Sequence, residues 1–205
     1  MTNLAFKPVS PSKSGSGPTD AALVIAARGG EAWAQQALFE RYARLVLGLS
    51  HRILPHPADA EDLAQDVFVH ALNRLDSLQN PQAFASWISS IVVRTASKRL
   101  RTRRLLVRLG LRRDQPVDLE SIVASGAPPE AAIELRAVYS VLHRLPAQER
   151  VAIVLRRVEG LELTEVAEQM GLSLATVKRR LARAEARLLK LRPESAAPGV
   201  SRVMP

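Results

Sequence analysis

The chain of 205 residues contains no cysteine. This absence excludes disulfide bonds, zinc sites made of thiolates and cysteine nucleophiles. The four histidines, His51, His56, His70 and His143, do not have the spacing of a paired metal site. A glycine-rich phosphate loop and a nucleophile motif are missing as well. We therefore expect no catalytic residues, no metal and no organic cofactor.

Long apolar runs are also missing. The first residues show no uninterrupted apolar stretch followed by a small-residue cleavage site, and no segment is apolar for long enough to span a bilayer. We therefore expect no membrane insertion and a cytoplasmic location. The alternating pattern of β-strands does not occur, so the apolar residues, 47% of the chain, predict an all-α fold.

Positive charge is abundant. Twenty-nine lysines and arginines stand against twenty acidic residues, which gives a net charge of +9 and a pI near 10.9. This balance favours a polyanionic partner, although charge alone does not identify the polyanion.

The chain is long enough for one sizeable core or two small ones, and its thirteen prolines gather near the ends and the middle, which favours two. Breaks at 29–30, 55–57 and 80–81 divide the first domain into four predicted helices. We predict helical domains at 20–104 and 131–192, a flexible linker at 105–130, and disordered tails at 1–19 and 193–205.

The segment 161–188, LELTEVAEQMGLSLATVKRRLARAEARL, predicts a helix-turn-helix. Gly171 permits the sharp turn, and Ser173 can cap the second helix. That helix has an apolar side, made by Leu174, Val177, Leu181, Ala184 and Leu188, and a basic side. The basic side fits the major groove of DNA, although such faces are often only solvated. We expect its first turns to contact phosphates and bases through Thr176, Lys178, Arg179, Arg180 and Arg183.

An acidic patch interrupts this basic chain at Asp59, Glu61, Asp62 and Asp66. Helix capping by Asp59 and favourable dipole interactions would explain the first three carboxylates. They do not explain Asp66, which lies two turns into the helix. A catalytic carboxylate pair or a magnesium site is a third hypothesis, but no phosphate loop or nucleophile motif accompanies it.

A strongly basic run follows an aromatic and apolar stretch that begins near Gln82. Nine arginines and lysines, and no acid, lie from Arg94 to Arg113. The run continues a helix that is predicted to end near Arg104, so its charges are held on a rigid element. We therefore interpret the run as a second nucleic-acid surface, and the alternative is a helix end whose charges are only solvated. Phe84 and Trp87 are predicted to be core, although such rings can also stack on unpaired bases.

Four blocks in this order resemble the bacterial sigma factors, and within them the small extracytoplasmic-function (ECF) group. They are FERYARLVLGLSHRIL (39–54), DAEDLAQDVF (59–68), FASWISSIVVR (84–94) and LPAQERVAIVLRRVEGLELTEVAEQMGLSLATVKRRLARAEARL (145–188). The resemblance covers about 20–191, and the short segment 105–130 fits a group that lacks the intermediate domain of larger sigma factors.

The resemblance implies that the first domain binds the polymerase clamp and the minus-10 element, and that the second binds the minus-35 element. By position, it assigns polymerase contacts to Asp62, Gln65 and Asp66, reading of the minus-10 element to the region 84–101, and minus-35 contacts to Thr176, Arg180 and Arg183. Within and beside the region 84–101 we expect the cations Arg94, Lys98, Arg99 and Arg101 to contact minus-10 DNA, and Lys178 and Arg179 stay minus-35 candidates from their place on the recognition helix. The chain departs from the family pattern at Arg94 and Lys98, where Asn and Asp are common, and at Arg179, where a small polar residue is common. Two added cations should strengthen attraction to phosphates of any sequence, so the minus-10 preference cannot be copied from relatives.

We therefore expect a dissociable promoter-specificity subunit without chemistry of its own. Its expected partners are core RNA polymerase and promoter DNA, with an anti-sigma factor as a partner common in the family, and the free protein is expected to be a monomer. The alternative is a stand-alone helix-turn-helix regulator that binds an operator as a dimer, which would leave the acidic patch without a role. A hydrolase or metal enzyme is a third class, and the missing motifs disfavour it.

Overall fold

The computed structural model describes residues 17–111 and 129–191. Most of the predicted tail at 1–19, the whole predicted tail at 193–205 and most of the predicted linker at 105–130 lie outside these residues. Within the described ranges the ordered elements are all helical and no strand occurs, which confirms the all-α fold in two helical domains. No helix in these ranges is long and apolar enough to cross a membrane.

The first domain contains the four predicted α-helices. They are α1 (Asp20–Arg28), α2 (Ala32–Ile53), α3 (Pro57–Asn73) and α4 (Phe84–Arg108), with the 3-10 turns η1 (Leu75–Ser77) and η2 (Pro81–Ala83) between the last two. Thr19 caps α1 by accepting a hydrogen bond from the backbone N–H of Ala22 at 3.2 Å. Pro57 begins α3, a position where its missing N–H costs no hydrogen bond.

The core of this domain is an apolar cluster around two aromatic rings. Tyr42 of α2 and Phe84 of α4 are almost completely buried, and their ring centroids lie 4.9 Å apart in an edge-to-face arrangement. The phenol of Tyr42 donates a hydrogen bond to the Asp20 carboxylate, which also binds Arg41 at 2.6 Å. Burial and the hydrogen bond to Asp20 raise the pKa of Tyr42, so the phenol stays protonated and keeps α1 attached to α2.

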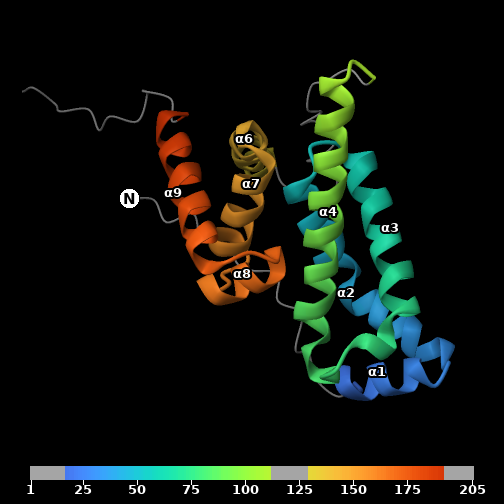
Figure 1. The fold of residues 1–205 in the computed structure, drawn as a ribbon. Helices are drawn as coiled ribbons and strands as arrows, with labels where there is room; N and C mark the ends of the chain where they lie inside the picture. The colour runs from blue at the N-terminus through green and yellow to red at the C-terminus, as the bar shows by residue number, and fades with distance from the viewer. Residues whose placement is uncertain (1–16, 112–128, 192–205) are drawn as a thin grey trace, which may run out of the picture.

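Helix α4 is longer than the sequence predicted. We expected it to end near Arg104, but it continues to Arg108 and lies between α3 and the second domain (Figure 1). The arginines favour helix, and the first residue that disfavours it is Gly110, at a φ of 70°. There the N–H groups of Gly110 and Leu111 bond to earlier carbonyls at 3.0 and 2.9 Å, in the pattern of a Schellman motif. The basic run up to Arg108 is therefore held on a rigid element.

The second domain contains α6 (Pro129–Arg144), α7 (Ala147–Ile153), the π-helical turn η3 (Val154–Val158), α8 (Leu163–Met170) and α9 (Leu174–Lys190). Helices α8 and α9 form the predicted helix-turn-helix. Gly171 has a φ of 63°, in the left-handed region, and the Ser173 side chain accepts a hydrogen bond from the N–H of Thr176 at 3.3 Å. Both predicted determinants of the turn are confirmed.

The apolar side of α9 packs as predicted except at its start. Val177, Leu181 and Ala184 are buried in the core of the second domain, and Leu188 packs against that core. Leu174 is 38% exposed, contrary to our expectation, and it is the first residue of the helix, with no preceding helical turn beside it.

The two domains touch in this structure. Helix α4 packs against α7 and α8, and α2 contacts α6 and α7 (Figure 1). An ion pair between Arg52 of α2 and Glu159, the residue after η3, joins the domains at 2.6 Å. Beside this contact a groove of about 1340 Å³ lies between α4 and the second domain.

Candidate polymerase and promoter interfaces

Part of the acidic patch of α3 is exposed to solvent. Asp62 and Gln65 are exposed, and neither makes an ion pair or side-chain hydrogen bond with the described part of the chain. Asp66 is also exposed, at 66% of its side chain, while pairing with Arg99 of α4. The three side chains assigned to polymerase are therefore accessible on one helix.

Capping does not explain Asp59. The residue before the first turn of α3 is His56, and Asp59 lies within that turn, where its negative charge suits the helix dipole. Its carboxylate reaches Arg103 of α4 at 3.2 Å. The capping hypothesis for Asp59 is thus wrong, and the residue instead joins α3 to α4.

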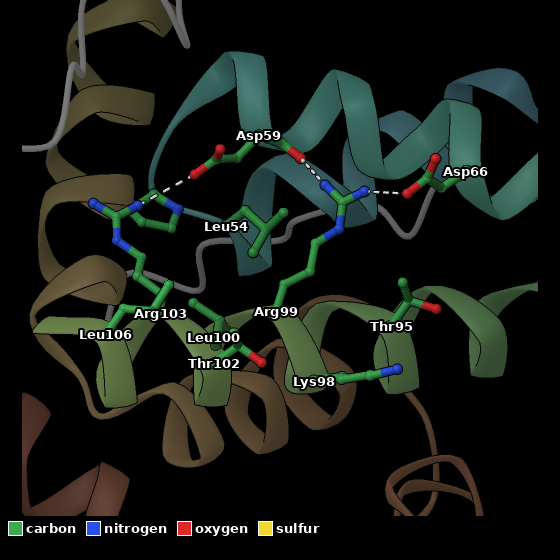
Figure 2. A pocket seen from close by; sticks show the side chains of 11 residues that line it. Leu54, Asp59, Asp66, Thr95, Lys98, Arg99, Leu100, Thr102, Arg103 and Leu106 are labelled. Atoms are coloured by element: carbon green, nitrogen blue, oxygen red, sulfur yellow. Dashed lines mark hydrogen bonds and ion pairs between the residues drawn. The ribbon is translucent and has the colours of Figure 1, made fainter. Parts of the chain in front are cut away.

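A pocket of about 430 Å³ between α3 and α4 gathers these contacts (Figure 2). The guanidinium of Arg99 points across it toward α3, where it binds the Asp66 carboxylate and donates to the backbone carbonyl of Asp59 at 3.2 Å. Arg103 lies one turn further along and also hydrogen-bonds His56. Arg99, which we assigned to minus-10 DNA, thus faces the acidic helix.

Of the other three residues assigned to minus-10 DNA, Arg94 and Arg101 lie on a different side of α4, and Lys98 lines both the pocket and the groove between the domains. Arg94, Lys98 and Arg101 are exposed and line the groove between the domains. The Nε of Arg94 donates to the carbonyl of Ser90 one turn earlier, at 3.1 Å, which fixes part of its side chain. The sequence-predicted set of four cations is therefore divided between two sides of one helix.

The aromatic residues at the start of α4 differ in exposure. Phe84 is 1% exposed and confirms the prediction of a core residue. Trp87 is partly buried, packs against the core, and has its ring centroid 5.9 Å from that of Phe84. Only Trp87 of this pair has ring surface left for a nucleobase.

Helix α9 presents most of its predicted DNA contacts to solvent. Lys178, Arg179 and Arg183 are exposed, and Thr176 is half-buried beside Ser173. Arg180 differs, because it donates to the side-chain oxygen of Gln148 in α7 at 2.6 Å and lines the interdomain groove. Partial burial, and the charge of Arg179, lower the pKa of Arg180.

The groove brings together cations that the sequence analysis did not connect. Among the residues that the structure describes, seven arginines and one lysine line the groove and no acidic residue does. Arg104 and Arg108 belong to the basic run that the sequence showed, but Arg150 of α7 stands alone in the sequence and gave no signal. Burial and the nearby charges of Arg104 and Arg103 lower the pKa of Arg150 to about 10.

Comparison with known proteins identifies the two domains. Residues 38–105 match the family model of sigma-70 region 2, and residues 135–188 match that of sigma-70 region 4. The ECF RNA polymerase sigma factor SigM of Mycobacterium tuberculosis is 32% identical over 173 residues, covering 84% of each chain. The ECF RNA polymerase sigma-E factor of Escherichia coli is 33% identical over 180 residues, covering 81% of this chain and 90% of the relative.

The chain belongs to the ECF family of RNA polymerase sigma factors. Solved structures share its fold: CnrH, in complex with the cytosolic domain of CnrY, is 30% identical with a TM-score of 0.57, and the match covers 84% of this chain and 96% of CnrH. The sigma factor RpoE of Bartonella quintana, in complex with the anti-sigma factor NepR, shares the fold with a TM-score of 0.61 at 23% identity, over 77% of this chain and 98% of RpoE. As a sigma factor, the protein directs the initiation of transcription.

Proposed function

We propose that this sigma factor binds core RNA polymerase through Asp62, Gln65 and Asp66 on α3. The observation that carries this assignment is the separation of charge on a basic protein. Acidic and amide side chains are exposed on α3, whereas the exposed cations of α4 and α9 lie on other surfaces. An acidic surface repels DNA and attracts a basic protein surface, so α3 is the element suited to a protein partner.

Promoter DNA binds the basic surfaces in this proposal. Arg94, Lys98 and Arg101 contact the minus-10 element, where Trp87 supplies ring surface for an unpaired base. Arg99 contributes there only when it gives up its contacts with α3. The minus-35 element is bound by the first turns of α9, through Thr176, Lys178, Arg179, Arg180 and Arg183.

The same proposal covers the organisation and partners of the chain. A polymerase-binding and minus-10-binding domain, predicted at 20–104 and extended to Arg108 by the end of α4, is joined by a linker to a minus-35-binding domain, predicted at 131–192 and beginning with α6 at Pro129. The tails predicted at 1–19 and 193–205 flank the two domains. The protein has no enzymatic activity of its own, works in the cytoplasm and is monomeric when free. RpoE is complexed with an anti-sigma factor, and this supports an anti-sigma factor as a third partner here. A dimeric operator-binding regulator is not favoured, since the relatives are sigma factors.

The polymerase assignment is tested by the double substitution Gln65→Ala and Asp66→Arg, with affinity for core RNA polymerase measured on the full chain. Both side chains are exposed, and an exposed ion pair contributes only about 0–1 kcal/mol, so helical content should stay unchanged while polymerase binding is lost.

The matched control is Arg99→Ala, which breaks the same ion pair from the other side. It should leave polymerase affinity close to that of the wild type, because Arg99 is not among the residues proposed to contact polymerase and the ion pair that it makes contributes only about 0–1 kcal/mol. Native affinity in the double variant would contradict the assignment. Equal loss in Arg99→Ala would show that Asp66 acts through α4 rather than by contacting polymerase.

A further inference from the structure

Three of the four histidines in the chain gather where the two domains meet. His143 of α6 interacts electrostatically with His51 of α2 and with His56, which precedes α3. The fourth, His70, is exposed on α3. Since α2 and α3 belong to one domain and α6 to the other, these side chains face each other across the junction.

The groups around these histidines are mostly cationic. The Arg150 guanidinium donates a hydrogen bond to Nδ1 of His143. Because an accepting ring nitrogen carries no proton, this contact requires the neutral form of the His143 imidazole. Nε2 of His143 and Nδ1 of His51 are buried without a hydrogen-bond partner among the described residues. The titratable and charged groups around the three histidines come from every helix packed at the junction. They are Arg52 from α2, Glu61 from α3, Arg103 and Arg104 from α4, Tyr139 from α6 and Arg150 from α7.

A buried ion pair next to this cluster holds the domains together. Arg52 and Glu159 are joined at 2.6 Å with 9% and 13% of their side chains exposed, and Arg52 also hydrogen-bonds Tyr139. Charge on nearby groups acts strongly in such a place because solvent screening is weak. Another positive charge beside Arg52 and Arg150 would therefore work against the closed contact.

We propose that this junction is a proton-sensitive latch, which holds the two domains together while His51 and His143 are neutral and lets them separate when both gain a proton. In the closed form, burial and neighbouring cations lower the pKa of His143 to about 3, and burial lowers the pKa of His51. Separation returns both rings to solvent, where the histidine pKa is about 6.5.

The direction of the pH effect follows from these values. A group whose pKa is lower in the closed form favours closure above its open-form pKa, and this contribution is lost as the pH falls. By pH 5.5, protonation of His143 should lower the ratio of closed to open protein about tenfold, and protonation of His51 should lower this ratio further. Separation also moves the second domain away from the cations of α4 that line the groove. If these cations bind promoter DNA, as the proposed function has it, acidification favours the form in which DNA can reach them from both domains.

The test uses the full chain. Because this chain contains no cysteine, two introduced cysteines can be labelled specifically. Asn73→Cys on α3 and Ala186→Cys on α9 place fluorescent labels at exposed sites in different domains, on helices that lie on either side of α4 (Figure 1). Energy transfer between the labels should report one distance at pH 7.5 and a growing population with a longer distance toward pH 5.5. The variant with His51→Gln and His143→Gln should stay closed at both pH values, whereas the control His70→Gln should behave like the wild type.

A second measurement does not depend on how well the histidine variants fold. Glu159→Gln removes one charge of the latch and should give the long distance already at pH 7.5. In this variant the NMR titration of His143 should move up toward pH 6.5, whereas in the wild type it should stay below. The proposal is overturned by a distance that does not change with pH, by the same pH response in the double glutamine variant, or by the same His143 titration with and without Glu159.

Discussion

Replacing Arg183 with alanine is expected to weaken recognition of the minus-35 element without damaging the fold. Arg183 is exposed on α9 and makes no ion pair with the described part of the chain, so its loss should change folding stability by no more than about 0.5 kcal/mol. An arginine that reads a base contributes about 1–3 kcal/mol of discrimination, which corresponds to roughly a 5- to 150-fold loss of affinity.

Arg180 should behave differently because of its contact with α7. Its guanidinium donates to Gln148, which holds the side chain toward the groove. Arg180→Ala removes both the DNA contact and this bond, whereas Gln148→Ala removes only the bond. We therefore expect a loss of DNA affinity within the same range for Arg180→Ala, and a smaller loss for Gln148→Ala.

The assay is anisotropy of a labelled promoter fragment with the assembled holoenzyme at several salt concentrations, compared with a fragment whose minus-35 element is scrambled. A base contact relaxes the preference at one position, while a phosphate contact weakens both fragments equally and reduces the salt slope by about one unit. Arg187→Ala is the control, because Arg187 pairs with Glu149 at 3.0 Å further along α9. Wild-type binding by both Arg180→Ala and Arg183→Ala would refute the assignment of α9 as the recognition helix.

Two further predictions concern the turn before α9 and the groove side of α4. Gly171→Ala should destabilise the helix-turn-helix by about 1–2 kcal/mol, since no atom lies within 4 Å of the added Cβ and the whole cost comes from the left-handed backbone. Amide hydrogen exchange in α8 and α9 of Gly171→Ala should then be about 5–30 times faster than in the wild type. Gly171→Asn should show a smaller increase, because asparagine tolerates the left-handed region better than alanine. Equal exchange rates in the wild type and the two variants would contradict this prediction. The double substitution Arg94→Gln and Lys98→Gln removes two positive charges from α4. It should slow formation of the open promoter complex and reduce the salt sensitivity of this step. Permanganate footprinting of the promoter at two salt concentrations measures this opening. If variant and wild type open the promoter equally at both concentrations, the two cations do not contact DNA and are only solvated.

The helix-turn-helix could be predicted in detail because its determinants are local. Gly171 must take a left-handed conformation and Ser173 must cap the next helix, and both requirements act within three residues of the turn. The packing of Val177 and Leu181 follows equally from spacing along one helix. Membership of the family could likewise be predicted, since it depends on the order of whole sequence blocks.

The direction of Arg99 could not be predicted, because it depends on how α4 is rotated against α3. Arg99 follows Lys98 directly in the sequence, but a step of one residue turns the side chain by about 100° around the helix. Arg99 therefore reaches Asp66, whereas Lys98 makes no such ion pair and lines the groove as well as the pocket. The groove itself joins residues as distant as Arg94 and Arg180, and such a pairing leaves no local pattern.

The two ion pairs between α3 and α4 differ in a way that bears on the proposed polymerase site. Arg103 and Asp59 are 11% and 35% exposed, whereas Asp66 is mostly exposed while it pairs with Arg99. An exposed pair contributes only about 0–1 kcal/mol, so a cationic group of polymerase can take over the Asp66 carboxylate at little cost to the fold. The better-shielded contact of Asp59 with Arg103 would then keep α4 in place. Releasing Arg99 in this exchange adds a free cation to the helix that we propose to bind the minus-10 element, which links polymerase binding on α3 to promoter binding on α4.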